Sequence, residues 1–177
     1  MFIFFLTWFP TYLKEARGLS LAATGWWSSV PYLGAFVGVL LSGFLSDRML
    51  RRGWSRDVAR KAPVLCGMML MTTIVAANYT TSIPLVIVFM TIAFFGNGLA
   101  SIAWVFISSI APVRMMGTVG GVFNFIGTLA TATIPAIIGW LAQDGNFEPA
   151  LIFIAVMSLL GFCSYLFLVG RVERIEP

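Results

Sequence analysis

The chain has 177 residues, of which 59% are apolar and 10% are charged, and its formal net charge is +4. This composition excludes an ordinary soluble domain and indicates a protein that is solvated mainly by lipid. The basic residues flank hydrophobic segments and do not line one face of a soluble domain, so we expect no nucleic acid partner. With two isolated cysteines and no histidine, the sequence predicts no disulfide and no metal site, and we expect no cofactor.

The first apolar run, Met1–Leu13, is shorter than the roughly 20 residues that a helix needs to cross the hydrocarbon core. It has no basic n-region and no small-residue cleavage site, so it does not resemble a signal peptide. We interpret it as a helix that lacks its start. Residues 1–177 are then one six-helix transmembrane bundle from a longer protein whose upstream part is missing.

Uncharged apolar windows predict six membrane spans. They are Met1–Leu13, Gly25–Leu45, Lys61–Asn78, Pro84–Ile110, Gly117–Ala142 and Pro149–Val169. Only helices and closed barrels satisfy their own backbone groups in lipid, and runs of this length are not the alternating strands of a barrel. The predicted fold class is therefore an all-α transmembrane bundle.

A basic connection, residues 46–60, separates the second and third spans and sets the predicted orientation. Six of the eleven basic residues fall between Arg48 and Lys61. Lys and Arg beside membrane spans stay in the cytoplasm, so this loop and the C-terminus are predicted to be cytoplasmic. Only Lys14 and Arg17 then lie outside. The aromatic residues near that outer end are interpreted as an interfacial belt: Trp8, Tyr12, Trp26 and Trp27.

Small residues form stripes on two of the predicted helices. The second span carries Gly34, Gly38 and Ser42, and the fifth carries a broad face from Gly117 to Thr131. Such stripes let helix backbones approach closely, so we expect these two helices to be packed and the third and sixth to face lipid. Gly34 and Gly120 align at an offset of 86 residues, as do Pro63 and Pro149, which favours two inverted three-helix repeats.

Charged residues are confined to loops and helix ends, so this chain contains no proton carrier within the membrane. A polar uncharged stripe lies instead on the fourth span. Asn97, Ser101, Trp104 and Ser108 share one helical face, and Gly96 and Gly98 would ease local opening of the helix around Asn97. Asn124 on the fifth span lies at the same depth as Trp104. Two interpretations stay open: a substrate site, or an interfacial Trp with polar residues that bond a neighbouring helix.

The beginning of the basic loop also has two interpretations. It carries Gly43, Asp47, Arg48, Arg51 and Arg52. Gly43 permits close packing at the helix end, and an acid beside arginines can form a breakable latch between two bundles. Alternatively, the segment is only a topology signal.

These residues resemble a known family. Gly43-Phe-Leu-Ser-Asp47-Arg48-Met-Leu-Arg51-Arg52 is similar to the loop signature of the major facilitator superfamily, in the copy between the eighth and ninth helices, with Leu50 in place of the usual glycine. Three further segments resemble its anion:cation symporters for sugar acids such as galactonate, glucarate and hexuronates. They are Phe5–Leu13, Ala59–Pro63 and Gly120–Asn124.

The resemblance implies the C-terminal six-helix half of a twelve-helix transporter in a bacterial inner membrane. Ser101, Trp104 and Asn124 match the family's polar substrate contacts, and Asn97 falls where relatives vary. The proton-binding carboxylates and the arginine that reads the substrate carboxylate belong to the first half, which would be this chain's main partner.

The function expected is proton-coupled symport of a small organic anion, with membrane lipid as solvent. An organic-anion or sugar-phosphate antiporter is the alternative within transport. A non-transporting membrane scaffold is the alternative of another class. No nucleophile and base pair, metal cluster or buried acid pair points to an enzyme.

Overall fold

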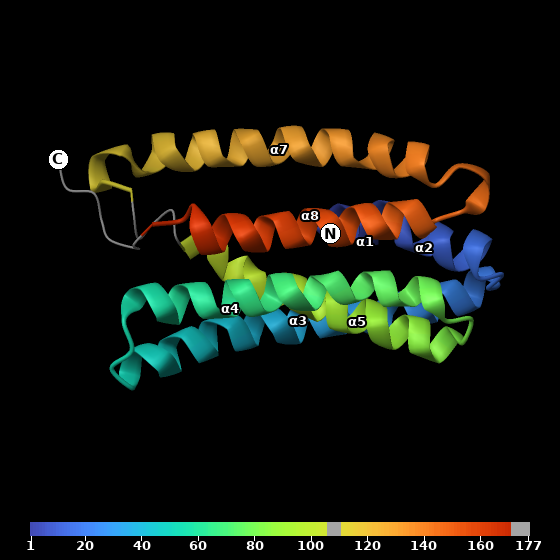
Figure 1. The fold of residues 1–177 in the computed structure, drawn as a ribbon, viewed down its shortest axis with the longest axis horizontal. Coiled ribbons are helices and arrows are strands. Elements are labelled where there is room, and N and C mark those ends of the chain that lie inside the picture. Colours follow the sequence, from blue (N-terminus) through green and yellow to red (C-terminus); the bar gives the residue numbers. More distant parts are fainter. Residues whose placement is uncertain (106–110, 171–177) are drawn as a thin grey trace.

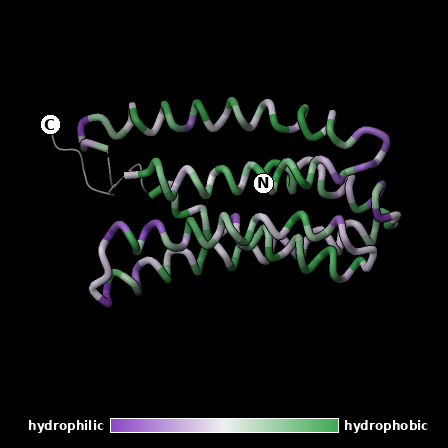
Figure 2. The backbone as a smooth tube through the Cα atoms, viewed as in Figure 1, coloured by the Kyte–Doolittle hydropathy of each residue, from purple (hydrophilic) through white to green (hydrophobic). Residues whose placement is uncertain are grey.

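The computed structural model describes residues 1–105 and 111–170, and every regular element in these residues is a helix (Figure 1). The predicted all-helical fold is confirmed. Five of the described helices are long and apolar enough to cross a membrane. Hydrophilic residues gather mainly at the two ends of the helix bundle, while the lengths of the helices are mostly hydrophobic (Figure 2).

The first span is broken into short pieces: α1 (Phe2–Thr7), α2 (Phe9–Thr11) and a π-helical turn, η1 (Tyr12–Ala16). Two spans change from α to 3₁₀ geometry near their ends, α4 (Arg56–Met71) into η2 (Thr72–Tyr79) and α5 (Ile83–Ala100) into η3 (Ser101–Ala103). The other long helices are α3 (Leu21–Arg51), α7 (Met116–Leu141) and α8 (Glu148–Phe167). Short 3₁₀ turns, η4 (Val113–Met115) and η5 (Gln143–Gly145), precede α7 and α8.

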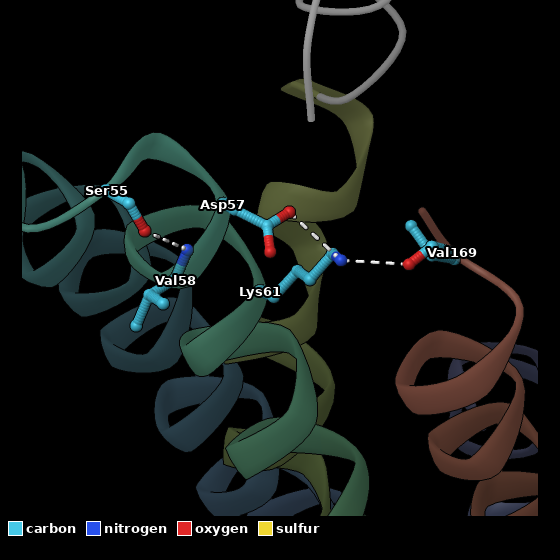
Figure 3. A network of polar contacts seen from close by, with 5 residues as sticks. All are labelled: Ser55, Asp57, Val58, Lys61 and Val169. Carbon is cyan, nitrogen blue, oxygen red and sulfur yellow. Dashed lines mark hydrogen bonds and ion pairs between the residues drawn. The ribbon is translucent and has the colours of Figure 1, made fainter. Parts of the chain in front are cut away.

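The basic connection between α3 and α4 is much shorter than the predicted loop of residues 46–60. Helix α3 continues to Arg51, because Arg, Met and Leu favour helix and cations near a C-terminus interact well with the helix dipole. Gly53, with φ of +80°, then ends the helix in a Schellman turn, in which the Trp54 amide donates to the Met49 carbonyl. Ser55 caps the start of α4 by accepting from the Val58 amide (Figure 3).

Helix α5 lies between α3 and α4 in direct backbone contact with both. On one side, Gly38 and Gly98 leave no room for a Cβ atom between α3 and α5. On the other side, Gly67 and Gly96 do the same between α4 and α5. The prediction that the glycine stripe of α3 is packed is therefore confirmed, but α4 is not simply an outer helix, because its single Gly67 makes an equally close contact.

The glycine stripe of α7 behaves differently. Residues 121–130 are all exposed, and a Cβ atom at Gly117, Gly121 or Gly127 would meet nothing within 4 Å in the described chain. Among the described residues, this stripe therefore has no close neighbour of the kind predicted. Helix α7 is instead held near its C-terminal end, where the ring of Trp8 packs directly on Gly139. A Cβ atom at Gly139 would lie 2.8 Å from ring carbon Cζ2 of Trp8.

Aromatic side chains of the broken first span form the centre of the core. Phe4, Phe5, Phe9 and Tyr12 are all almost completely buried. The belt interpretation is thus wrong for Tyr12, and Trp8 is also engaged, since its indole N–H donates to the Pro135 carbonyl at 3.1 Å. Trp26, by contrast, is 81% exposed.

Cations cap helix ends at both ends of the bundle. Lys61 of α4 donates to the Val169 carbonyl just beyond α8 at 2.9 Å and pairs with Asp57 at 3.0 Å (Figure 3). At the opposite end, Arg17 donates to the carbonyls of Ala77 and Thr80 near the end of η2. Cations stabilise helix C-termini, so these contacts tie neighbouring spans together.

We predict that Gly38→Ala destabilises the fold, because the added methyl group must displace backbone atoms of α5. Overpacking of this kind costs about 1–3 kcal/mol, and we expect a clear fall in the melting temperature of the purified protein. Gly25→Ala is the matched control on the same helix, where the methyl group meets open space. Equal melting temperatures for the two variants would contradict the close α3–α5 contact.

Candidate functional site

A cavity of about 540 Å³ opens between α1, α3 and the α5–η3 helix. Three of the predicted site residues, Asn97, Ser101 and Trp104, line it together. The predicted shared face of the fourth span therefore exists in the described part of the chain. Ser108, the fourth member of the stripe, lies outside the described residues.

The packing of α5 explains why Asn97 is directed into the interior. Gly96 is held against α4 and Gly98 against α3, so the residue between them is turned away from both contacts. Asn97 also lines a second cavity of about 240 Å³, together with Met68, Met71 and other residues. The predicted helix opening at Asn97 is not seen. The change to 3₁₀ geometry comes later, at Ser101.

Trp104 reaches from the end of η3 to α7. Its ring meets Phe123 edge-on, with centroids 5.2 Å apart and an interplanar angle of 76°. Asn124 follows Phe123 directly in the chain. Asn124 is exposed and does not line the 540 Å³ cavity in the described chain. Only Trp104 of the two is a lining residue of this cavity.

Sequence reasoning missed the aromatic wall of the cavity, which Phe2, Tyr32 and Phe94 form. The available signal was the spacing of Tyr32, Ala35, Phe36 and Val39, which places all four on one face of α3. Every residue that lines the cavity in the described chain is uncharged. The cavity can therefore offer hydroxyl, amide and aromatic contacts, but it has no group of its own to neutralise an anion.

The residues of the predicted latch lie at the C-terminal end of helix α3. Arg48 and Arg51 occupy its last turn and Arg52 is its C-cap. Asp47 is exposed and makes no ion pair with any described residue. The close packing predicted for Gly43 is absent, since a Cβ atom there would meet nothing within 4 Å of the described chain. These side chains are thus available to groups outside the described structure.

Five helices that are long and apolar enough to cross a membrane indicate a multi-pass membrane protein. The chain belongs to the Major Facilitator Superfamily, whose family model matches residues 1–177. This confirms the family resemblance and the prediction that the chain is not an enzyme.

Several curated transporters are similar to this chain. It is 49% identical over 172 residues to the "D-galactonate transporter" of Escherichia coli O6:H1, covering 97% of this chain and 40% of that protein. It is 42% identical over 174 residues to the "Probable galactarate/D-glucarate transporter GarP" of Escherichia coli K12, covering 98% and 39%. It is also 42% identical over 173 residues to the "Probable galactarate/D-glucarate transporter GudP" of Bacillus subtilis 168, covering 97% and 38%. The chain spans about two fifths of these relatives.

We predict that the Trp104–Phe123 contact couples η3 to α7 energetically. Aromatic pairs of this geometry contribute about 0.5–1.5 kcal/mol beyond burial. A double-mutant cycle of Trp104→Ala and Phe123→Ala, read out by thermal unfolding, should therefore give a coupling free energy in that range. The control cycle pairs Trp104→Ala with Phe125→Ala, an exposed residue of α7 with no described ring contact. Equal coupling free energies in the two cycles would show that the Trp104–Phe123 contact does not stabilise the protein.

Proposed function

We propose that this chain is the C-terminal half of a proton-coupled symporter that moves a sugar acid, such as a hexonate, hexarate or hexuronate, across a bacterial inner membrane. The observation that carries the proposal is the combination of an uncharged polar cavity with a long exposed face on α7. A second bundle that covers this face would enclose the cavity at the interface between the two halves. The sugar-acid relatives support the choice of substrate.

Each candidate residue has a role suited to a polyhydroxylated anion. Ser101 and Asn124 exchange hydrogen bonds with substrate hydroxyls, since a hydroxyl and an amide both donate and accept. Trp104 packs its exposed ring against the carbon skeleton. Asn97, which faces two cavities, sets how far the substrate extends toward α4 and α8.

The charges that the mechanism needs come from the other half. An anion in a membrane cavity requires a cation, and proton coupling requires a carboxylate, but the lining of this cavity supplies neither. Asp47 and the arginines that follow it then form the latch to the other half in one state and release it in the other. In this arrangement the α3–α4 turn and the C-terminus are cytoplasmic, as the basic residues indicate.

We predict that Asn124→Ala raises the KM for sugar-acid uptake about 5- to 10-fold, because the substrate loses a hydrogen bond of roughly 1 kcal/mol or slightly more. The measurement is uptake of labelled substrate by the full-length protein in proteoliposomes. Thr133→Ala is the matched control, since Thr133 lies about two and a half turns along α7, on the face opposite Asn124, and bonds only carbonyls of its own helix among the described residues.

Three outcomes would contradict parts of the proposal. Unchanged kinetics in Asn124→Ala would remove that residue from the binding site. Uptake that does not respond to an imposed pH gradient but requires a counter-substrate inside the vesicle would replace symport with the antiport alternative. Wild-type protein that moves no sugar acid from a panel of hexonates, hexarates and hexuronates would remove the substrate assignment.

A further inference from the structure

We propose that Tyr32 is a positioning residue that couples occupancy of the substrate cavity to the docking of the broken helix α1. The inference rests on the proposed transport function for the identity of the ligand, a polyhydroxylated acid. Its structural basis is independent of that function. Tyr32 lines the cavity from α3, and its hydroxyl donates to the Phe5 carbonyl of α1 at 2.8 Å.

Three elements meet at this tyrosine. The ring of Tyr32 meets Phe94 of α5 edge-on, with centroids 5.2 Å apart and an interplanar angle of 81°. Phe94 in turn stacks on Phe5 of α1, with centroids 4.0 Å apart and an interplanar angle of 4°. The hydrogen bond from Tyr32 to Phe5 adds a direct contact between α3 and α1. The cavity wall thus exists in this form only while α1 is docked.

Helix α1 is the element best suited to move. It ends at Thr7, and the following α2 contains Pro10, which cannot donate a backbone hydrogen bond. The π-helical turn η1 comes next. Helix α3 and α5, in contrast, are locked together by glycine contacts. The Tyr32 hydrogen bond ties this rigid pair to the broken helix, beside the aromatic packing of Phe5 on Phe94.

The chemistry of a phenol permits the coupling. Tyr32 uses its only proton toward Phe5, which leaves its oxygen lone pairs as acceptors. A substrate hydroxyl that donates to this oxygen polarises the phenol and strengthens its bond to the carbonyl. Substrate binding and α1 docking then favour each other, and the linkage is reciprocal.

The test is Tyr32→Phe in the full-length transporter, because phenylalanine keeps the ring contacts and removes only the hydroxyl. Loss of a hydrogen bond of about 1 kcal/mol corresponds to about a 5-fold effect. We expect KM to rise about 5-fold, because the hydroxyl that links substrate to α1 is gone, and kcat to change less than about 2-fold. Tyr79→Phe is the control, since Tyr79 is 81% exposed near the opposite end of the bundle from the α3–α4 turn.

A second readout separates positioning from general structural support. A spin label at Leu6→Cys on α1, with Cys66 and Cys163 replaced by Ser, should become more mobile in Tyr32→Phe. Substrate should reduce the label's mobility when Tyr32 is present but not in Tyr32→Phe, because the coupling runs through the hydroxyl. A KM within 2-fold of wild type, or label mobility that Tyr32→Phe does not alter, overturns the inference. If the wild type transports no sugar acid, the proposed function is wrong. The mobility of the spin label measured without substrate then still decides whether Tyr32 holds α1 in place.

Discussion

Backbone contact between α5 and its two neighbours is the constraint on which the rest of the structure depends. Lipid provides little hydrophobic force to drive helices together, so association must come from close packing and hydrogen bonds. Glycines on the three helices bring α3 and α4 each into contact with the backbone of α5. That packing fixes the rotation of α5 and thereby directs Asn97, Ser101 and Trp104 to a common cavity.

The contrast between α5 and α7 explains how a rigid bundle can carry a binding surface. Both helices are rich in small residues, yet those of α5 are buried in helix contacts and those at residues 121–130 of α7 are exposed. An exposed stripe of glycine, threonine and asparagine is suited to a surface that must approach substrate and a second bundle closely. The broken helix α1 contacts α3 and α5 through the Tyr32 hydrogen bond and the stacking of Phe5 on Phe94.

Much of the fold could be predicted because lipid restricts the possible structures so strongly. Long uncharged runs had to be helices, and the spacing of Gly34 and Gly38 predicted a real contact. The polar stripe of Asn97, Ser101 and Trp104 was also visible as a helical period.

Other features depended on tertiary contacts that no local pattern contains. Gly67 resembled an isolated glycine, yet it meets Gly96 across the α4–α5 contact. Tyr12 was assigned to the membrane interface from its position, but it is buried, and it accepts a hydrogen bond from Arg17 at 2.9 Å. The basic segment was assigned to a loop from its charge, although arginine is a good helix former and α3 extends through most of it. Tyr32 carried no charge and had no motif, so only the cavity revealed it.

Water access to the exposed face of α7 decides whether this face lines a hydrated cavity between two halves of a transporter. In a variant of the full-length protein with Cys66 and Cys163 replaced, a cysteine at position 124 can be labelled in intact membranes. The account predicts rapid reaction with a water-soluble thiol reagent and protection by the transported sugar acid, because this face lines a hydrated cavity between two halves. Reaction only with a lipid-soluble reagent, unaffected by substrate, would show that the face contacts lipid and would contradict the account.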